Sequence, residues 1–440
     1  MARLVIGNRV NGPYLKDISP ESLWHTGAQG QRLVWCARPG DVLVLALAPD
    51  PGFLAYATGM LGFAGSGLDV VVPPEGKLGP AVLTRDRFTG DAVLDGLRRL
   101  VRERRLDSVE PFYFDGYVNQ LARGLGLAGG TPGFAFVDQG GHELLNSKAV
   151  FRAVAAGTGL PIPEGVVTSS PEDAVDFCWD LLRSGRPVIV KQDRNVAGLG
   201  NEILSRTAEI DPLGAAHHEI VTGRAALAGH IAARWPWYTN DSLYPVVIEE
   251  YLAGSVPIWG EVAISDRSTD IFGYGKVRMR PICAGVIIPV PDAPPAFADF
   301  LVHLEALAVT MRSMGYRGLT NIDAVLTPDG RVLFNEFNAR YGGSTHLFAI
   351  GERVIGGDYL RDRCIVERRE CGYPAFGPAL RALTGSGLAY DPRTRTGVII
   401  SVYGTRMDGT GGEACIVGEN LAAAEELERE LAELFPSDAP

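Results

Sequence analysis

The feature that most constrains this 440-residue chain is the segment 321–345, which reads as two β-strands joined by a tight turn. The Pro-Asp-Gly sequence at 328–330 supplies the turn, because proline and glycine favour the backbone angles of a chain reversal. A hairpin of this kind places the first strand against the second. We therefore expect Asp323 and Glu336 to lie on facing strands.

Two further side chains extend this pattern. Asn338 should point to the same side as Glu336, because side chains two apart on a strand share a face, and Arg340 falls on that face again. Two carboxylates and an amide oxygen form a hard donor set suited to Mg2+. Magnesium and an arginine together can stabilise a phosphoryl group during its transfer. The alternative is a plain hairpin whose acids face solvent.

Composition limits the classes of protein to which the chain can belong. It is 46% hydrophobic and 21% charged, which is typical of a globular protein. Its length indicates roughly two to four domains. The formal net charge of −11 argues against nucleic acid or acidic membrane as the main partner. The six cysteines have no CxxC spacing, so we expect free thiols and neither a zinc site nor a redox motif.

Neither the N-terminus nor the apolar runs indicate a membrane protein. The opening MARLVIG is typical of the start of a strand and not of a signal peptide. The longest apolar run, Val42–Ala48, is too short to cross a bilayer. We expect a cytoplasmic protein that binds neither membrane nor nucleic acid, and base rates favour a homodimer.

The order of strand and helix signals divides the chain into three parts. Residues 1–145 alternate short apolar runs with amphipathic stretches, which predicts an α/β domain with parallel strands. Residues 146–370 predict a larger domain that contains antiparallel strands and includes a lobe at about 185–250. Residues 371–440 predict a short α+β domain. The fold class is therefore multidomain, with α/β and α+β parts.

Individual elements follow from periodicity and from turn residues. We expect helices at 91–104, 148–157, 173–183, 217–234, 297–314 and 421–435. We expect strands at 109–114, 187–191, 202–204, 246–251, 260–265, 271–276 and 398–402.

Lys191 ends an apolar strand and precedes a loop that contains Gly198 and Gly200. Glycines let backbone N–H groups turn toward an anion, and lysine adds a point charge, so this segment can hold phosphates. The alternative is an ordinary hairpin with an exposed lysine.

The strand Ile248–Leu252 carries two acids, Glu249 and Glu250, within an apolar run. A buried acid needs a partner, and an adenine amino group together with the edge of the strand could serve. The alternative is an edge strand whose acids face water.

Lys276, Arg278 and Arg280 alternate along another strand and share a face. The simple interpretation is a solvated surface, but the neighbouring hairpin makes a phosphate or carboxylate partner credible. His217 and His218 are expected in a helix, on different faces. No Ser-His-Asp or Cys-His arrangement is present, which disfavours a hydrolase with a covalent nucleophile.

The order of these pieces resembles the ATP-grasp superfamily over roughly residues 146–370. The matching pieces are a lysine at a helix start, a strand lysine with its glycine loop, an Ile-Glu-Glu-Tyr-Leu strand and a Glu-x-Asn-x-Arg pattern: Lys148, Lys191, 248–252 and 336–340. The resemblance implies that ATP and Mg2+ bind between two α+β lobes.

The resemblance also implies a role for each nucleotide-binding residue. Lys148 and Lys191 contact the ATP phosphates, and the loop 194–201, with Gly198 and Gly200, closes over them.

The adenine and ribose contacts are implied in the same way. Glu249 accepts a hydrogen bond from the adenine amino group, and the main chain of Glu250 and Leu252 meets the edge of the ring. Glu261 is the candidate for the ribose.

The metal ligands implied by the resemblance are Asp323, Glu336 and Asn338. Arg340 steadies the acyl-phosphate, and Arg278 is a second candidate for the γ-phosphate. Together with Lys191, these two arginines are the catalytic candidates.

The whole architecture also resembles the pheganomycin-type peptide ligases of actinobacteria, on the Ile-Gly-Asn at 6–8 and the glycine-rich segment 390–418. That likeness implies an ATP-dependent, ADP-forming carboxylate–amine ligase. It would activate an amino-acid-like carboxylate as an acyl-phosphate and couple it to the N-terminal amine of a peptide, in antibiotic or other natural-product biosynthesis. Two alternatives stay open: a ligase with a single amino acid or a thiol as acceptor, and a non-catalytic ATP-binding regulatory protein.

Overall fold

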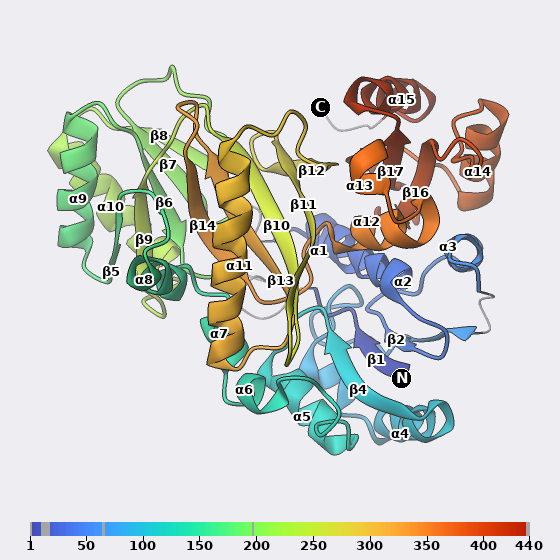
Figure 1. Cartoon of the computed structure of the whole chain (residues 1–440). Coiled ribbons are helices and arrows are strands. Elements are labelled where there is room, and N and C mark those ends of the chain that lie inside the picture. The colour runs from blue at the N-terminus through green and yellow to red at the C-terminus, as the bar shows by residue number, and fades with distance from the viewer. Residues whose placement is uncertain (1, 10–17, 64–66, 196–197, 437–440) are drawn as a thin grey trace.

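The computed structural model describes residues 2–9, 18–63, 67–195 and 198–436. Three β-sheets organise this part of the chain (Figure 1): a four-stranded N-terminal sheet, a five-stranded sheet and an eight-stranded central sheet. Helices lie against all three, so the chain has the mixed α/β character predicted from its sequence. No helix within the described residues is both long enough and apolar enough to cross a lipid bilayer.

The N-terminal sheet is parallel, as predicted, with the strand order β3-β2-β1-β4. Its strands are short runs between helical segments, the arrangement that buries a parallel sheet. The strands are β1 Ala2–Ile6, β2 Val42–Val44, β3 Asp69–Val71 and β4 Leu106–Pro111. The helices are α1 Pro20–Ala28, the 3-10 helix Gln29–Arg32, α2 Leu33–Cys36, α3 Pro51–Met60, the 3-10 helix Arg85–Phe88, α4 Asp91–Arg104, α5 Gly116–Gly124, α6 Phe134–Asp138 and α7 Gly141–Leu144.

The five-stranded sheet forms the smaller lobe, with the order β5-β9-β6-β7-β8. It begins at Gly165 and not at about 185 as predicted, because β5 pairs with β9 at its edge. Its strands are β5 Gly165–Thr168, β6 Val188–Gln192, β7 Asn201–Ser205, β8 His217–Ile220 and β9 Val246–Glu250. The helices around it are α8 Lys148–Thr158, α9 Pro171–Arg183 and α10 Arg224–Tyr238.

One predicted helix in this lobe is wrong. His217 and His218 lie on strand β8, which pairs in parallel with β7, and the helix begins only at Arg224, after Gly223. A free edge of β7 gives the segment hydrogen-bond partners that its own sequence does not reveal, so sheet pairing overrides the helical pattern.

The central sheet has the order β14-β13-β10-β11-β12-β15-β17-β16 and is antiparallel throughout. Its strands are β10 Val256–Ile264, β11 Thr269–Met279, β12 Cys283–Ile288, β13 Gly318–Leu326, β14 Val332–Asn338, β15 Cys364–Cys371, β16 Gly397–Tyr403 and β17 Gly412–Gly418. Helix α11 Ala296–Met314 covers one face at the β10–β14 end (Figure 1). The other helices are α12 Thr345–Ile350, the π-helix Gly351–Ile355, α13 Tyr359–Asp362, α14 Phe376–Gly385 and α15 Leu421–Leu434.

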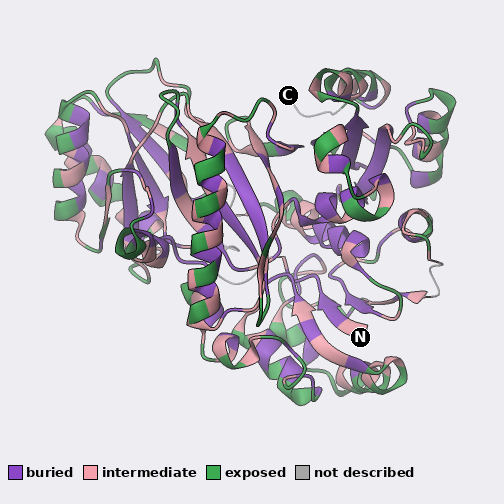
Figure 2. Cartoon of the chain, viewed as in Figure 1, coloured by how far each residue is buried: buried purple, intermediate pink, exposed green. Residues whose placement is uncertain are grey.

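The C-terminal segment does not form a sheet of its own. β16 and β17 extend the central sheet through β15, and in Figure 2 these strands are buried while the surrounding helices expose one face. The core also crosses from the N-terminal part to this segment. Trp35 Nε1 donates to the Ser401 carbonyl at 2.7 Å, and the rings of Phe53 and Phe376 pack edge to face at 6.0 Å. The first and last parts of the chain are therefore held together by shared apolar packing.

Candidate functional site

The hairpin that stood out in the sequence is present, formed by β13 and β14. Asp323 lies directly opposite Glu336 in the strand register, and Asn321 lies opposite Asn338. The predicted facing arrangement of the two acids is confirmed.

The side chains at this point form a connected group that we call the hairpin cluster: Lys148, Asp323, Glu336, Asn338 and Arg340. Lys148 Nζ lies 2.7 Å from Glu336 Oε2, and Asn338 Nδ2 donates to Asp323 Oδ2 at 3.0 Å. Arg340 donates to Asn146 Oδ1, which lies just before helix α8. The cluster therefore joins the hairpin to the start of α8.

The two acids have opposite pKa shifts. Burial raises the pKa of Asp323 well above its usual value, and the facing charge of Glu336 raises it further. Burial acts in the same direction on Glu336, but Lys148 and Arg340 outweigh it and lower the pKa of Glu336 to about 2. Two carboxylates held this close repel each other, which favours either a shared proton or a bound cation.

The start of α8 contacts both the loop that follows β6 and the hairpin. Ser147 caps the helix by accepting from Val150 N at 3.1 Å, and its own hydroxyl donates to Asp193 Oδ1 at 2.7 Å. Lys148 Nζ also donates to the Asn195 carbonyl at 2.8 Å. Because Asp193 and Asn195 belong to the loop after β6, this helix start holds that loop next to the hairpin.

Lys191 lies in the smaller lobe, on β6, as predicted. Its Nζ forms an ion pair with Glu249 Oε2 on the neighbouring strand β9, and the other oxygen of Glu249 accepts from Arg152 of α8. Glu249 is only 1% exposed. Both of its carboxylate oxygens are thus taken by cations, so the prediction that Glu249 accepts from an adenine amino group does not fit this structure. Arg152 was not foreseen, and nothing in its local sequence indicates the contact.

Glu250 and Leu252, at and just beyond the end of β9, make contacts within the protein. Glu250 is half-buried, with Oε2 3.5 Å from Arg186 Nη1, and its backbone N–H donates to the Glu164 carbonyl at 2.9 Å. Leu252 follows at the end of β9, and its carbonyl accepts from Ser255 N at 3.2 Å. Contacts of this main chain with a ring stay a prediction.

The loop between β6 and β7 needs its glycines. Gly198 has φ +83°, and a Cβ there would lie 2.8 Å from the Gly214 carbonyl oxygen. A Cβ on Gly200 would lie 2.4 Å from the Cβ of Asn195. The predicted loop also includes residues 196 and 197, which lie outside the described residues. The described part shows a tight, glycine-dependent backbone beside the hairpin cluster.

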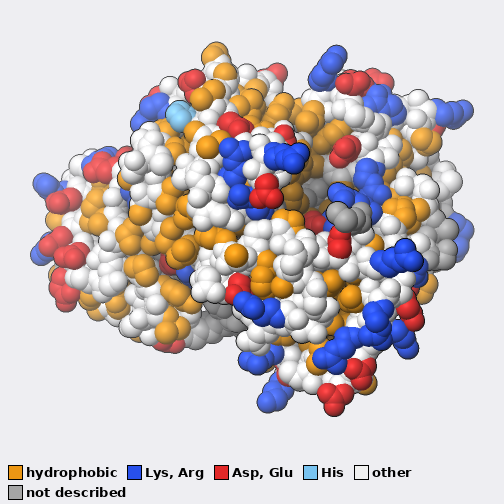
Figure 3. Space-filling model, turned by 60° about the horizontal axis from the view of Figure 1, so that its bottom comes forward, with side chains coloured by type: hydrophobic (Ala, Val, Ile, Leu, Met, Phe, Trp, Pro, Cys, Tyr) orange, Lys and Arg blue, Asp and Glu red, His pale blue; other side chains and the backbone are white. Residues whose placement is uncertain are grey.

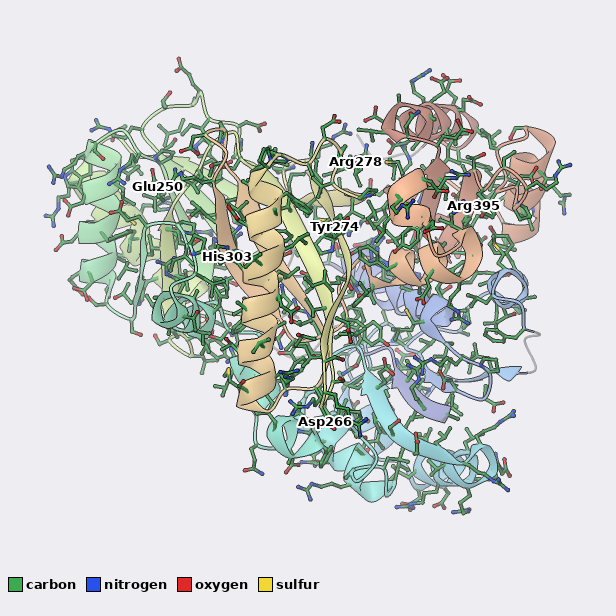
Figure 4. All side chains as sticks on the ribbon, viewed as in Figure 1. Glu250, Asp266, Tyr274, Arg278, His303 and Arg395 are labelled. Atoms are coloured by element: carbon green, nitrogen blue, oxygen red, sulfur yellow. The ribbon has the colours of Figure 1, made fainter. Side chains whose placement is uncertain are left out.

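Two predicted site residues have other partners in the structure. Arg278 forms a two-pronged ion pair with Glu428 of α15, at 2.7 and 2.9 Å, and Figure 4 shows it on the side of the sheet toward the C-terminal helices, far from Glu250. Glu261 is 1% exposed on β10 and accepts from the hydroxyls of Ser344 and Thr345 at 2.7 and 2.6 Å. The first placement gives no support to a γ-phosphate role, and the second does not fit a ribose ligand.

Glu261 instead anchors the turn that follows Arg340. Burial raises the pKa of Glu261 to about 7, with the hydrogen bonds from Thr345 and Ser344 opposing the shift. Thr345 in turn accepts from Gly342 N at 2.8 Å. The buried carboxyl of Glu261 therefore holds the turn after the hairpin through hydrogen bonds. Nothing in the sequence indicated this function.

Figure 3 shows Lys and Arg side chains gathered, together with acidic ones, around a hollow in the molecule. Such a surface suits a small, charged ligand better than an extended apolar one.

Known proteins give this arrangement a context. Residues 30–127 match the family described as the Pre ATP-grasp domain, and residues 378–431 match the PGM1 C-terminal domain. The biotin carboxylase domain of the Hydrogenobacter thermophilus 2-oxoglutarate carboxylase, solved with MgADP, ADP and bicarbonate, is similar in structure. It has a TM-score of 0.58 at 13% identity, with 99% of this chain and 90% of that chain covered.

A second solved structure extends the likeness. The N5-carboxyaminoimidazole synthase of Aspergillus clavatus, solved with ADP and 5-aminoimidazole ribonucleotide, has a TM-score of 0.55 at 14% identity and covers 98% of both chains. The chain has an ATP-grasp fold. The multidomain class predicted from the sequence is thereby confirmed.

A sequence relative of this chain is also known. The phosphoribosylamine–glycine ligase of a Synechocystis strain is 25% identical over 216 residues. The match includes 46% of this chain and spans less than half of the relative, 45% of its length. This likeness supports the fold assignment, but it covers too little of the relative to establish the activity of this chain.

Proposed function

We propose that this protein is an ATP-dependent, ADP-forming ligase that activates a carboxylate as an acyl-phosphate and joins it to an amine. The observation that carries the proposal is the hairpin cluster, in which two facing carboxylates, an amide and two cations meet at the start of α8. The ATP-grasp fold and the ligase and carboxylase relatives support it.

The hairpin cluster suits Mg2+ by its chemistry. Asp323, Glu336 and Asn338 present hard oxygen atoms on one hairpin. Burial and the facing charge of Glu336 both raise the pKa of Asp323, and a divalent cation would offset both effects. We propose these three residues as the ligands. When bound, Mg2+ would offset the charge of phosphate oxygens during transfer.

The cations of the site would act on the phosphates of ATP. Lys148 and Lys191 approach from two elements, α8 and β6, and each now forms an ion pair with a glutamate. A triphosphate can compete for these ammonium groups, because lysine is a mobile point charge with three donors. Arg340 is held by Asn146 at the turn beyond the hairpin, where its fixed charge can stabilise the acyl-phosphate.

The chemistry needs activation, because hydroxide is a poor leaving group and a carboxylate does not react with an amine at neutral pH. A carboxylate oxygen attacks the γ-phosphorus of ATP, the bond to the β,γ-bridging oxygen breaks, and ADP leaves. The amine then attacks the carbonyl carbon of the acyl-phosphate. Inorganic phosphate leaves with one original carboxylate oxygen, and the amine loses a proton. The glycine-dependent loop after β6 would exclude water, which would otherwise hydrolyse the acyl-phosphate.

The finer proposal concerns the two substrates. We propose an amino-acid-like acid and the N-terminal amine of a peptide, in natural-product biosynthesis. This part rests on the resemblance to pheganomycin-type ligases and on the match of residues 378–431 to the PGM1 C-terminal domain. We also propose a homodimer, the state named for the similar biotin carboxylase domain.

The test is to incubate the protein with Mg-ATP, a pool of amino acids labelled with 18O in the carboxylate, and a pool of short peptides, and to follow products by mass spectrometry. We expect ADP, phosphate that carries 18O and a new amide mass. AMP with pyrophosphate would contradict the mechanism. ATP binding without turnover over a wide acid panel would favour the non-catalytic alternative, and a product formed only with free amino acids or thiols would change the acceptor.

A further inference from the structure

A second buried group of charged residues lies where three distant parts of the chain meet. We call it the junction cluster, and its members are Arg9, Arg32, His346, Glu367, Arg369 and Glu413. The first two belong to the N-terminal part, His346 begins the segment after the hairpin, and the others lie on β15 and β17. Arg32, His346, Glu367 and Glu413 are each at most 2% exposed.

The two carboxylates of the junction cluster are fully engaged. Glu367 accepts from Arg32 Nη2 at 3.1 Å and from Arg369 Nε at 2.9 Å. Glu413 accepts from Arg32 Nε at 2.8 Å and from Gln29 Nε2 at 2.6 Å. Each of the four carboxylate oxygens therefore already has a donor.

The cluster contains a grouping that could be mistaken for a metal site. Ligand atoms of His346, Glu367 and Glu413 all lie within 4.8 Å of one another. Arg32 and Arg369 already hold both carboxylates, however, and a divalent cation would have to displace them while facing their positive charge. The surroundings oppose a cation.

Several donors of the cluster have no protein acceptor. Arg9 Nη1 is buried without a hydrogen-bond partner, while the guanidinium lies 5.2 Å from the centre of the Phe112 ring. Both ring nitrogens of His346 are buried and unpartnered as well. Burial lowers the pKa of His346 well below its usual value, and Arg32, Arg369 and Arg9 lower it further, while the nearby Gly343 backbone opposes the shift. The neutral ring keeps one N–H to donate.

The backbone of a glycine lies close to these donors. A Cβ on Gly343 would lie 3.3 Å from Arg369 Nη2 and 3.4 Å from Arg32 Nη1. The Gly343 carbonyl accepts from that Arg32 nitrogen at 2.6 Å, which fixes the backbone against the cluster. The backbone at Gly343, three residues beyond Arg340, therefore packs closely against both guanidinium groups, and a side chain there would crowd them.

The charge of the junction cluster is unbalanced. Three guanidinium groups face two carboxylates among these described residues, and His346 is neutral. Burial lowers the pKa of Arg9, Arg32 and Arg369 lower it further, and Glu413 and Glu367 oppose the shift. A buried charge without a partner is costly, so a monoanion at this point would stabilise the protein.

We propose that the junction cluster is a subsite for a carboxylate group of the substrate, with Arg9, Arg369 and His346 as its donors. A carboxylate carries the single negative charge that the cluster lacks and accepts from a guanidinium in a two-pronged geometry. A phosphate dianion would exceed that charge and face Glu367 and Glu413. The inference rests on the proposed function, because it assigns part of the acid substrate to this place beside the hairpin cluster.

The first test compares thermal unfolding of the wild type with Arg9→Met and with a matched control, Arg206→Met. Arg206 lies 5.6 Å from the centre of the Trp179 ring, as Arg9 lies over Phe112, but it is exposed in the smaller lobe. Each protein is heated in potassium acetate, potassium phosphate or potassium chloride at equal ionic strength. We expect acetate to raise the Tm of the wild type and the control above its value in chloride, and Arg9→Met to lose that rise.

Other results in this test count against the proposal. No rise with acetate, or a rise that Arg9→Met keeps, would overturn it, and a rise with phosphate alone would overturn the assignment to a carboxylate. Without added anion, Arg9→Met should unfold at the same or a higher temperature than the wild type, because Nη1 has no partner to lose. A clear fall in Tm would show that Arg9 has a structural role instead.

Nucleotide binding separates this inference from the proposed function. Titration with Mg2+ and the non-hydrolysable analogue AMP-PNP should give equal affinity in the wild type and in Arg9→Met. If the wild type does not bind the nucleotide, the proposed function fails, whatever acetate does. If the nucleotide binds and the acetate effect is absent, only the subsite fails.

The kinetic test uses the acid that the 18O experiment identifies. Loss of a charge-assisted hydrogen bond should raise the KM for that acid roughly 10- to 100-fold in Arg9→Met, with partial recovery in Arg9→Lys. A raised KM with an unchanged kcat would identify a second, non-reacting carboxylate at the junction cluster. A fall in kcat as well would identify the reacting one, and no change in either constant would overturn the subsite.

Discussion

The hairpin cluster and the junction cluster are both buried groups of cations and carboxylates, but they differ in which groups keep free capacity. In the hairpin cluster, Asp323 and Glu336 face each other and Lys148 pairs with only one of them. In the junction cluster, both carboxylates are saturated and the unused groups are donors, such as Arg9 Nη1. The first therefore offers oxygen atoms to a cation, and the second offers N–H groups to an anion. Under our two proposals, similar composition gives opposite ligand preference, because the hydrogen bonds already made decide which atoms are left to bind.

The largest effect is expected for a carboxylate of the hairpin cluster. Glu336→Gln keeps the shape of the side chain but removes the charge that pairs with Lys148 and would bind Mg2+. We expect ADP formation to fall by ~1000-fold or more, because both the metal and the positioned cation are affected. The measurement is the rate of ADP release at saturating Mg-ATP and substrates.

A matched control lies on the same hairpin. Asp329 sits in the exposed turn and accepts from Arg331 Nε at 2.8 Å. Asp329→Asn should leave the rate within about twofold, because exposed ion pairs contribute little. Full activity in Glu336→Gln would break the distinction between the two clusters.

The next largest effect is expected where the carboxylates of the junction cluster meet their arginine partner. Arg32 holds both Glu367 and Glu413, so Arg32→Met leaves two buried carboxylates without their shared partner. We expect a loss of about 3–5 kcal/mol in the free energy of unfolding, measured by urea denaturation. Arg393→Met is the control, since Arg393 pairs with Asp391 at the surface and should change stability by less than about 1 kcal/mol. Equal effects of the two changes would show that the junction cluster is not a tightly coupled group.

A third prediction concerns Glu249 in the smaller lobe, whose negative charge compensates two neighbouring cations. Glu249 compensates both Lys191 and Arg152, and Glu249→Gln would leave two cations close together. We expect a loss of about 3 kcal/mol in unfolding free energy together with weaker binding of Mg2+ and AMP-PNP. The control is Glu164→Gln, which removes the same charge from an exposed pair with Arg186. Tighter nucleotide binding in Glu249→Gln would instead show that the glutamate restrains Lys191.

The smallest effect is expected at Glu261, the buried acid that anchors the turn after Arg340. The pKa of Glu261 rises on folding from 4.5 to about 7, so the folded chain binds this proton more tightly than the unfolded chain. Its contribution to stability is complete below pH 4.5 and is lost as pH rises through 7. Stability of the wild type relative to Glu261→Gln should therefore fall by about 1–3 kcal/mol between pH 5 and pH 8. A difference that does not depend on pH would mean that Glu261 keeps one protonation state.

Much of the architecture followed from local pattern. The helices at 91–104 and 148–157 lie close to where periodicity placed them, and the N-terminal strands are parallel as expected. Local caps, apolar stripes and breakers carry this information. The helix expected at 217–234 failed at its start, where pairing with β7 made a strand. The continuous sheet through β15 was also missed, because pairing between distant strands leaves no local signal.

In the candidate site, too, local sequence determined some contacts and the packing of distant elements determined the others. The sequence by itself determined that Asp323 faces Glu336 and that Lys191 precedes a glycine loop, because strand period and turn residues act over a few positions. Only the tertiary structure decided that Glu249 is occupied by Lys191 and Arg152, that Arg278 pairs with Glu428, and that Glu261 supports the turn after Arg340. It alone also brought Arg9, His346 and Arg369 together. Those contacts depend on how separate elements pack, and the charge balance of a buried group exists only once its members meet.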